Sequence, residues 1–342
     1  MENAVVGKPR VVVLGGGNGT SRLLKALLPW QQAGKIESLY ALVHMADDGG
    51  STGKLRAQYE VGAMGDLTNS LIALSTLAGD IRGEELLKAL AYRFESGDFK
   101  GHTLRNILLT VFELTSHDID SAISIMARLI QIPKFTGVIP LTLKPLTQQV
   151  VVGEKVLGEG QHFISWNVDM QSDPSWKPGD VRIVFKEKDV ELNPRAAKAL
   201  EEATHIIVAP GHTVGTILPT LATPGLKQAI EKSAAKLTIV VTLLTTPKQT
   251  TGWSGEDFVR VYESYVGRKA DVVVANTAMP DIGLVAGQDW VRFGDSEHNY
   301  ELIKSEVAKV LDISQHKADT VPRPILVHDE EKMKEVFAKI LF

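Results

Sequence analysis

Short apolar runs alternate along the chain with longer segments whose apolar residues recur at helical spacing. The first run, residues 10–14, is rich in valine and ends at a glycine cluster, and four leucines between positions 23 and 28 follow with helical periodicity. A second apolar run at 38–45 leads directly into another glycine-rich loop. Strand, helix and strand in this order predict a βαβ unit.

In the middle of the chain, the spacing of the apolar residues changes twice. Residues 66–129 carry apolar faces at helical spacing, and no convincing strand pattern interrupts them. Between 138 and 192 the period becomes two, with β-rich runs at 150–152 and 181–185 separated by glycine, proline and aspartate. We interpret the first segment as helical and the second as a small antiparallel insertion.

Alternation of helix and strand resumes after this insertion. Asn193 and Pro194 have the pattern of a helix cap followed by proline at the first helical position, ahead of an apolar strand at 205–209. Two more strands of the buried type, 237–244 and 271–275, flank a helix that opens with a capping-box sequence. The pattern favours a parallel sheet that is covered on both faces.

These elements predict the α/β fold class: a Rossmann-like, mostly parallel sheet covered by helices, with a small antiparallel β insertion. By length, the 342 residues could form one large domain or two ordinary ones. We interpret residues 1–342 as a single domain, with a core at about 8–137 and 193–342 and the β-rich insertion at about 138–192. The tail mixes helical segments with an apolar run at 325–327, a candidate late strand.

Composition narrows the classes of partner and compartment. Lysine and arginine total 37 against 41 aspartate and glutamate, and the net charge of -4 offers no broad attraction for nucleic acid or an anionic membrane. The chain has no cysteine, which excludes disulfides and thiolate chemistry and fits a reducing compartment. The first residues lack a signal-peptide pattern, and no apolar run approaches the ~20 residues that span a bilayer. We therefore expect a soluble, cytoplasmic protein with no nucleic-acid or membrane partner.

The first glycine-rich loop, between the first strand and the first helix, is a candidate phosphate site. Glycines let backbone N–H groups approach a phosphate closely, and the start of the following helix favours an anion. The dinucleotide fingerprint is only partly met, because Thr20 stands where the third glycine belongs. A tight turn without a ligand is the structural alternative. The candidate contacts in this loop are Gly15, Gly16, Gly17, Asn18, Gly19 and Thr20.

The second loop, residues 47–54, carries two adjacent carboxylates. It is not a Walker A loop, because Leu55 takes the place of the hydroxyl residue that would meet magnesium. Asp47 and Asp48 are suited to bind a divalent ion such as magnesium, to accept hydrogen bonds from hydroxyls, or to act as a base. For one of them the alternative is an Asx turn that caps the loop, and we favour Asp48 as the one that faces a ligand. The other candidate contacts here are Gly49, Gly50 and Ser51.

Two further clusters and one strand end complete the candidate site. Asp66 is either a helix cap or a ligand contact, and Asn69 is a polar residue one turn later on an otherwise apolar helix. His212 follows the strand at 205–209 and is a candidate general acid or base, or an ordinary hydrogen-bonding group. His102 fits a helix cap region and the pocket equally well. The remaining candidate contacts are Gly211, Thr213, Gly215, Thr216 and Asn276.

The shared position of these loops predicts one ligand site. In open parallel sheets, ligands bind outside the carboxyl ends of the strands, at the point where the strand order reverses. We therefore expect a phosphate-bearing nucleotide or nucleotide sugar at this edge. Metalloprotease and serine-hydrolase motifs are missing from the sequence. An NAD-dependent dehydrogenase is the least favoured interpretation, because Asp47 lies ~30 residues past the glycines instead of ~20.

The order of the motifs resembles the CofD/YvcK family. The resemblance rests on GGGNGTSRLL at 15–24, ADDGGSTGKLR at 46–56, GDLTNSLIALS at 65–75, GHTLRN at 101–106 and APGHTVGTILP at 209–219. It runs from Val11 to about Asn276 and is densest in the first third of the chain. The chain looks closer to the YvcK branch, the gluconeogenesis factors, although Asn18 stands where that branch usually has threonine.

This resemblance implies a Rossmann-like core with a β-rich insertion, often as a homodimer, and two candidate functions. The YvcK branch implies a nucleotide-sugar (UDP-sugar) binding protein linked to cell shape and carbon metabolism. The CofD branch implies a transferase that moves phospholactyl or a related group from a guanylyl donor to a deazaflavin, with magnesium. Whether the chain is an enzyme therefore stays open. Carried over by position, the first glycine loop would hold phosphates, Asp47 and Asp48 would lie near phosphate or magnesium, and Asn69 and the loop from Gly211 to Thr216 would complete the pocket.

Overall fold

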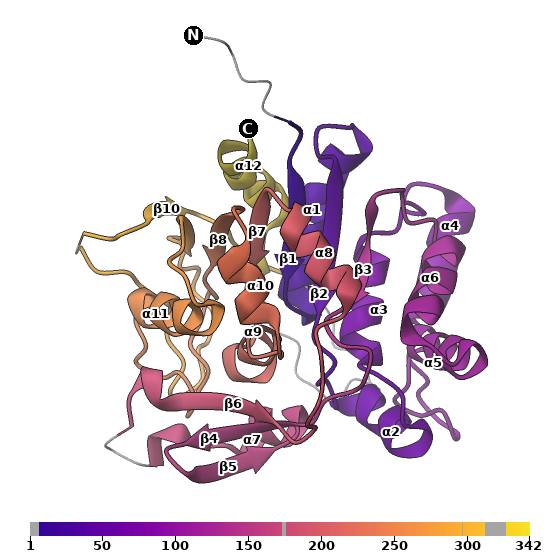
Figure 1. Cartoon of the computed structure of the whole chain (residues 1–342), viewed down its shortest axis with the longest axis horizontal. Helices are drawn as coiled ribbons and strands as arrows, with labels where there is room; N and C mark the ends of the chain where they lie inside the picture. Colours follow the sequence, from indigo (N-terminus) through magenta and orange to yellow (C-terminus); the bar gives the residue numbers. More distant parts are fainter. Residues whose placement is uncertain (1–6, 173–175, 296, 312–325) are drawn as a thin grey trace.

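The computed structural model describes residues 7–172, 176–295, 297–311 and 326–342. Its centre is a parallel sheet of seven strands in the order β10-β9-β8-β7-β1-β2-β3 (Figure 1). The α/β fold class expected from the sequence is confirmed. The strands are β1 (Arg10–Leu14), β2 (Ser38–Val43), β3 (Thr136–Pro140), β7 (His205–Val208), β8 (Lys236–Val240), β9 (Val272–Asn276) and β10 (Glu301–Ser305).

Both faces of the sheet are buried, and the central strand β1 shows how. Val11 and Val13 belong to one apolar core, while Val12 and Leu14 belong to the other. Because side chains of a strand alternate between faces, a strand covered on both sides is apolar along its buried length, as residues 11–14 are. The first core includes residues of α1 (Gly17–Gln32), α3 (Met64–Ala73) and α12 (Glu330–Leu341), and the second includes residues of α8 (Pro194–Glu202), α9 (Leu218–Leu221), α10 (Leu226–Lys232) and α11 (Gly255–Val266).

The helical interpretation of the segment after β2 is confirmed. Four further elements there are α2 (Gly50–Tyr59), α4 (Ile81–Ala91), α5 (Leu104–Ser116) and α6 (Ile119–Leu129). The caps predicted for the second half are also present: Asn193 accepts a hydrogen bond at the start of α8, and Ser254 and Asp257 form a reciprocal capping box at the start of α11. In the described residues, no helix is both long and apolar enough to cross a bilayer.

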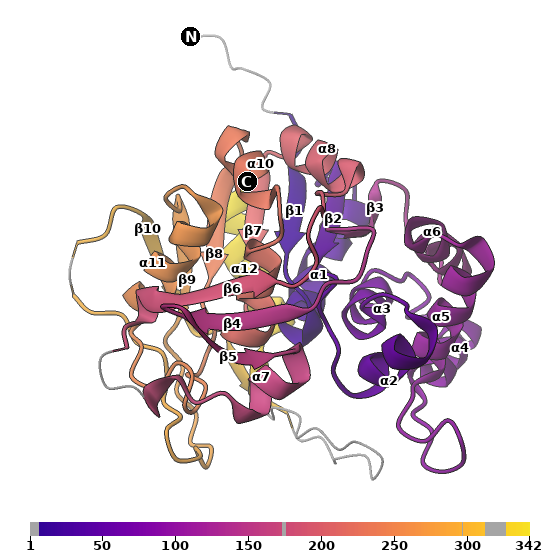
Figure 2. The same cartoon turned by 60° about the horizontal axis from the view of Figure 1, so that its bottom comes forward.

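A small antiparallel sheet lies beyond the carboxyl ends of the main strands, where the sequence predicts an insertion (Figures 1 and 2). Its strands are β4 (Gln148–Val152), β5 (Lys155–Glu159) and β6 (Val181–Phe185), and it carries α7 (Gln161–Asn167) and the short 3-10 turns Met170–Ser172 and Pro178–Asp180. Its boundary differs from the expected one. Val138 to Pro140 pair with β2 in the main sheet, so the inserted part begins after Pro140.

The tail adds one more strand to the main sheet than the sequence suggests. β10 pairs in parallel with β9 at the edge of the sheet, in a segment whose pattern did not single out a strand. The late strand expected at 325–327 is found as β12 (Leu326–His328), which pairs with β11 (Ala308–Val310); Ile325 lies outside the described residues. α12 then packs against α1, where Phe337 is fully buried.

Candidate functional site

The strand order reverses between β1 and β7, so the loops that follow these two strands meet at one crevice. The loop after β1 and the loop after β7 are in close contact. A Cβ on Gly19 would lie 1.9 Å from the carbonyl oxygen of Pro210, which no side chain at position 19 could avoid. Gly17 has a φ of +69°, a backbone conformation that favours glycine. The first glycine loop is therefore shaped by backbone contacts, and it presents N–H groups in place of side chains.

The two helices that begin in the glycine-rich loops, α1 and α2, lack side-chain caps. Gly16 at the start of α1 and Gly49 at the start of α2 make no capping hydrogen bond. Five other helices are capped by Asp80, Asp118, Asn193, Ser254 and Asp329. Uncapped first-turn N–H groups, together with the helix dipole, are suited to bind an anion.

Two side chains of the first glycine loop have different surroundings. Asn18 is exposed at the first turn of α1, where it can reach a ligand. Thr20 is fully buried, and its hydroxyl donates to the carbonyl oxygen of Gly16 at 3.0 Å. Thr20 therefore shapes the loop, and its hydroxyl is already engaged.

Asp47 organises the second loop. Its Oδ1 accepts the Gly49 N–H at 3.0 Å, which is the Asx turn weighed from the sequence, and its Oδ2 accepts the Thr52 hydroxyl at 2.9 Å. Thr52 in turn accepts the Gly65 N–H at 3.0 Å, so one carboxylate ties the starts of α2 and α3 together. Burial, reinforced by the nearby charge of Asp66, raises the pKa of Asp47 to about 7.

Asp48 connects the same loop to the insertion. Its Oδ1 accepts the backbone N–H of His162 at 2.8 Å, which supplies the first turn of α7 with an acceptor. A Cβ on Gly160 would lie 2.5 Å from Asp48 Oδ2, so glycine is needed where the two segments meet. The side chain favoured as a ligand contact thus also fixes the insertion over the loops.

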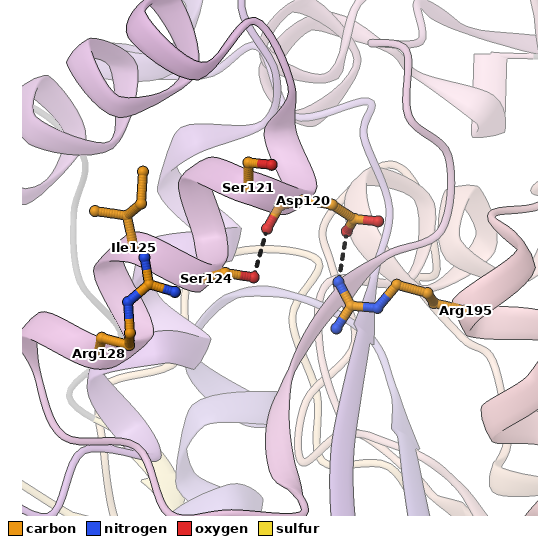
Figure 3. Close-up of a pocket in the computed structure, with 6 residues that line it drawn as sticks. All are labelled: Asp120, Ser121, Ser124, Ile125, Arg128 and Arg195. Carbon is orange, nitrogen blue, oxygen red and sulfur yellow. Dashed lines mark hydrogen bonds and ion pairs between the residues drawn. The ribbon is translucent and has the colours of Figure 1, made fainter.

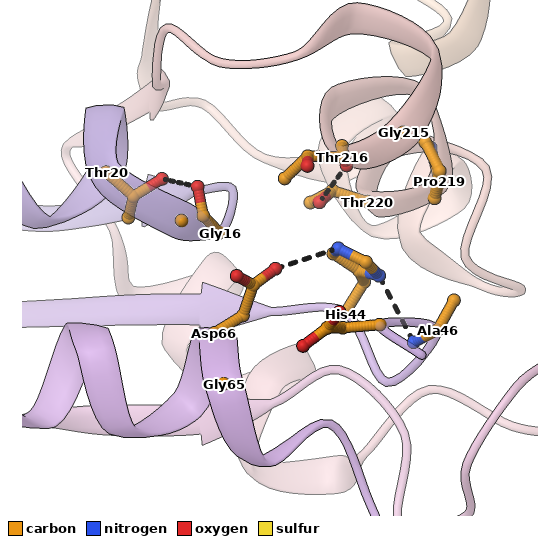
Figure 4. A network of polar contacts seen from close by, with 12 residues as sticks. Gly16, Thr20, His44, Ala46, Gly65, Asp66, Gly215, Thr216, Pro219 and Thr220 are labelled. Atoms are coloured by element: carbon orange, nitrogen blue, oxygen red, sulfur yellow. Dashed lines mark hydrogen bonds and ion pairs between the residues drawn. The ribbon is translucent and has the colours of Figure 1, made fainter. Parts of the chain in front are cut away.

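A buried pair lies beneath the first glycine loop (Figure 4). His44 is fully buried, its Nδ1 accepts the Ala46 N–H at 3.1 Å, and its Nε2 lies 3.3 Å from Asp66 Oδ2. Asp66 in turn lies so close to Gly16 that a Cβ there would be 2.3 Å from Oδ2. The 3.3 Å contact is an ion-pair distance without hydrogen-bond geometry, since neither atom has a hydrogen-bond partner in the described residues. The sequence analysis missed His44, although a histidine at the end of an apolar strand is a signal.

Ser51 belongs to a polar chain that sequence spacing did not reveal. Its hydroxyl lies 3.0 Å from His102 Nδ1 and accepts from Asn106 Nδ2 at 3.2 Å, and Thr68 donates to Asn106 Oδ1 at 2.8 Å. All four residues are buried. Burial lowers the pKa of His102, which favours its neutral form. His102 is therefore part of a buried network behind the second loop. Beside it, Asn69 Oδ1 accepts from Arg105 at 2.5 Å.

The loop after β7 continues into a π-helical turn, Thr213–Ile217, and then α9. His212 caps this turn, because its Nδ1 accepts the Gly215 N–H at 2.8 Å. That hydrogen bond leaves the proton of the neutral ring on Nε2. Desolvation of the ring lowers the pKa of His212 to about 4. At neutral pH the side chain is thus an uncharged donor.

Two threonines of the β7 loop have different surroundings. Thr213 lies 3.1 Å from the Tyr262 hydroxyl inside the core, and burial raises the pKa of Tyr262. Thr216 is buried across from the His44–Asp66 pair (Figure 4), and its backbone carbonyl accepts from Thr220 at 2.8 Å. The structure thus brings the β7 loop to the first glycine loop, while Thr213 is engaged with the core.

Asn276, at the end of β9, has a defined structural partner set. Its Oδ1 accepts the backbone N–H groups of Ala278 at 3.2 Å, Val307 at 3.1 Å and Ala308 at 3.0 Å. These bonds fasten the turn that follows β10. The structure therefore places Asn276 at the expected edge, engaged in holding a turn.

The hydrogen bonds of the two aspartates limit which of their oxygens would hold a magnesium ion. Within the residues that the structure describes, no three histidine or acidic side chains are grouped as a metal site. Both Asp47 oxygens and Asp48 Oδ1 accept protein hydrogen bonds. Magnesium in phosphate sites needs only one or two carboxylates besides the phosphates and waters. Asp48 Oδ2 therefore fits as a single protein ligand to an ion that enters with a phosphate.

A separate hollow of about 300 Å³ lies between α6 and α8 (Figure 3). Its lining includes Ser121, Ser124 and Arg128, together with an ion pair of 3.0 Å between Arg195 and Asp120. None of the site residues expected from the sequence lines it. The crevice between β1 and β7 therefore remains the candidate nucleotide site.

Comparison with known proteins gives one consistent family. The model of the CofD family, described as 2-phospho-L-lactate transferase CofD, matches residues 11–315. A Listeria innocua protein named gluconeogenesis factor is 32% identical over 296 residues, 86% of this chain and 84% of that protein. A Thermotoga maritima relative is 30% identical over 341 residues, 97% of this chain and 99% of its own length.

A solved structure shares the fold. The crystal structure of a UPF0052 family member from Bacillus halodurans superposes with a TM-score of 0.80 at 24% identity. The match covers 97% of this chain and 99% of the other. At this identity, the likeness bears on the fold alone.

The His212 cap predicts an acid-sensitive contribution to stability. The folded pKa of about 4 lies below the ordinary value of 6.5, so between these values the unfolded chain binds the proton and the folded chain does not. The contribution is complete above pH 6.5 and is lost as the pH falls toward 4. His212→Asn keeps an acceptor for the Gly215 N–H but does not titrate, so we expect its melting temperature to fall less than that of the wild type over this window. Parallel curves of melting temperature against pH would contradict the assignment.

Proposed function

The chain belongs to the CofD family and resembles gluconeogenesis factors over most of its length, and from this premise we propose that it binds a UDP-sugar at the crevice between β1 and β7. The supporting observation is the set of uncapped N–H groups at the starts of α1 and α2, beside a glycine loop that approaches the Pro210 carbonyl. These groups suit the pyrophosphate of a nucleotide sugar. A link to cell shape and carbon metabolism, and a cytoplasmic location, belong to the same proposal.

The carboxylates near the crevice divide the site by charge. Asp66 lies against Gly16, and Asp47 lies one loop away, so the floor of the crevice is acidic. Phosphate oxygens are favoured at the helix starts, while hydroxyl or N–H donors are favoured near the carboxylates. A nucleotide sugar carries phosphate oxygens for the helix starts and sugar hydroxyl groups for the carboxylates. Inorganic phosphate has no sugar hydroxyl groups.

A transferase of the CofD type is the second candidate, and one observation favours it. A carboxyl group with a pKa of about 7, as in Asp47, is suited to accept or donate a proton at neutral pH. In such a reaction Asp47 could take the proton of an acceptor hydroxyl, and magnesium would supply charge neutralisation for a guanylyl donor. Incubation with a deazaflavin acceptor, an activated donor and magnesium tests this candidate, because only a transferase yields a phosphorylated product.

Assembly as a homodimer is also proposed, on the family resemblance and on exposed apolar side chains of α4 and α5. Ile81 of α4 is 79% exposed, and Val111 and Leu114 of α5 are 45% and 42% exposed. Apolar side chains exposed in this way are typical of an interaction surface.

Light scattering should give twice the mass of the 37.2 kDa chain, and a Val111→Glu variant should shift toward the single-chain mass. A wild-type mass of one chain would contradict the homodimer.

We expect UDP-N-acetylglucosamine or UDP-glucose to bind with at least micromolar affinity, about -8 kcal/mol or better. Calorimetry against both sugars, with GDP, GTP and NAD as comparison ligands, measures this directly. Absence of heat with every UDP compound would refute the proposal, and heat with the guanylyl compounds alone would favour the transferase.

The Asp48→Asn variant tests the charge at the second loop. Asparagine keeps an acceptor for the His162 N–H, so the melting temperature should change little. If Asp48 Oδ2 meets magnesium or the ligand, loss of the charge should cost roughly 1.5 to 3 kcal/mol, about ten- to a hundred-fold in affinity. We expect this loss with magnesium present and a smaller one without it, because only a metal ligand makes the difference depend on the ion. Equal affinities of wild type and variant under both conditions would assign Asp48 to the insertion alone.

A further inference from the structure

A second hollow, of about 340 Å³, lies between the insertion and the loop that follows β8. Gln171 and Trp176 line it from the insertion, and Thr251, Trp253 and Asp257 line it from the other side. None of the residues assigned above to the crevice lines it. Its volume is at the low end of the range of about 300 to 1,000 Å³ that ligand sites occupy, which suits a single ring better than a whole nucleotide.

Two tryptophans give this hollow an aromatic wall. The rings of Trp176 and Trp253 are stacked, with centroids 5.9 Å apart and an angle of 22° between their planes. Trp253 is 4% exposed, and its ring centroid lies 5.0 Å from that of Phe258 in the core. Its position is therefore fixed by packing. Trp176 is half-buried and forms the outer part of the wall.

The polar groups of the hollow carry no free charge. Asp257 accepts from the Ser254 N–H at 2.9 Å and from Arg260 at 2.5 Å, so its carboxylate is already compensated. The indole N–H groups of Trp176 and Trp253 are buried and have no hydrogen-bond partner in the part of the chain that the structure describes. Buried indole N–H groups usually have a partner, so an oxygen-bearing ligand would satisfy a donor that the fold leaves unused.

The hollow belongs to the same edge of the sheet as the nucleotide crevice. β8 lies next to β7, about 4.8 Å away, and the loop after β8 contacts α7, since Gln249 donates to the Ile164 carbonyl at 2.7 Å. The adjacent Ser165 lies against Gly215 of the β7 loop. Gln171 then joins the insertion to Thr251 by a hydrogen bond of 2.9 Å. A continuous path of contacts therefore runs from the crevice to the hollow.

We propose that this hollow binds the sugar ring of the nucleotide sugar, an inference that rests on the proposed function. The apolar face of a sugar ring packs on an indole, and its hydroxyl oxygens accept from N–H donors. A phosphate is disfavoured, because no uncompensated cation lines the hollow within the described residues. A base is disfavoured as well, because Gln171 Nε2 already donates to the Thr251 carbonyl and, among the described residues, no lining side chain offers a free donor and acceptor side by side.

The test compares UDP with UDP-N-acetylglucosamine by calorimetry. We expect Trp176→Ala to weaken UDP-N-acetylglucosamine about tenfold and to leave UDP unchanged, because only the sugar reaches the hollow. Val156→Ala is the control: Val156 is also in the insertion, on β5, is 50% exposed and does not line the hollow. It should leave both affinities unchanged, and melting curves should show that both variants are folded.

Two results would overturn the sugar site while leaving the nucleotide site standing. One is an unchanged affinity for UDP-N-acetylglucosamine in Trp176→Ala, and the other is an equal loss for UDP, which would place the base or phosphates in the hollow. If no UDP compound binds the wild type, the proposed function fails, and saturation-transfer NMR with free N-acetylglucosamine decides the hollow separately. Saturation transfer to N-acetylglucosamine that is seen with the wild type and lost in Trp176→Ala would support the sugar site. No saturation transfer with the wild type would overturn it.

Discussion

The close approach of α1 to the β7 loop is the constraint on which the rest of the site depends. β1 and β7 are neighbours in the sheet, but α1 packs on one face and the helices that follow β7 pack on the other. The two connections therefore diverge and leave a crevice at their carboxyl ends. Gly19 lets the backbone of α1 touch the Pro210 carbonyl, so the two loops are in direct contact. A methyl group there would separate the two loops and the N–H groups that they present.

Several side chains expected to face a ligand also hold parts of the structure in place. Thr20 closes the first loop, Asp47 joins the starts of α2 and α3, Asp48 supports α7, and Asn276 fastens a distant turn. Polar residues beside glycines signal loops that need a defined shape, and such loops also occur where ligands bind. The type of residue and its place in the pattern were therefore predictable. Its partner was not, because Asp48 and His162 are separated by 114 positions along the chain.

The fold was predictable from the sequence at its centre and much less at its margins. Central strands such as β1 and β9 are covered on both faces, so four of the five residues in each are apolar and the strands stand out from the sequence. Within the seven-stranded sheet, the two strands that the pattern placed incompletely or missed, β3 and β10, are the two edges. β10 has the sequence ELIKS, with both ends polar and no fully buried residue. An edge strand is half-exposed and often carries charge, so its alternation is weak.

The insertion contacts three loops at the carboxyl edge of the sheet through α7. α7 touches the second loop through Asp48, the β7 loop through Ser165 and the β8 loop through Gln249, so one short helix contacts three segments of the crevice wall. An isolated helix of seven residues has little stability of its own, and its position must come from these contacts. The shape of the crevice and the placement of the insertion are therefore coupled. A ligand that orders the three loops would also hold α7 in place, and a change that frees α7 would loosen all three loops.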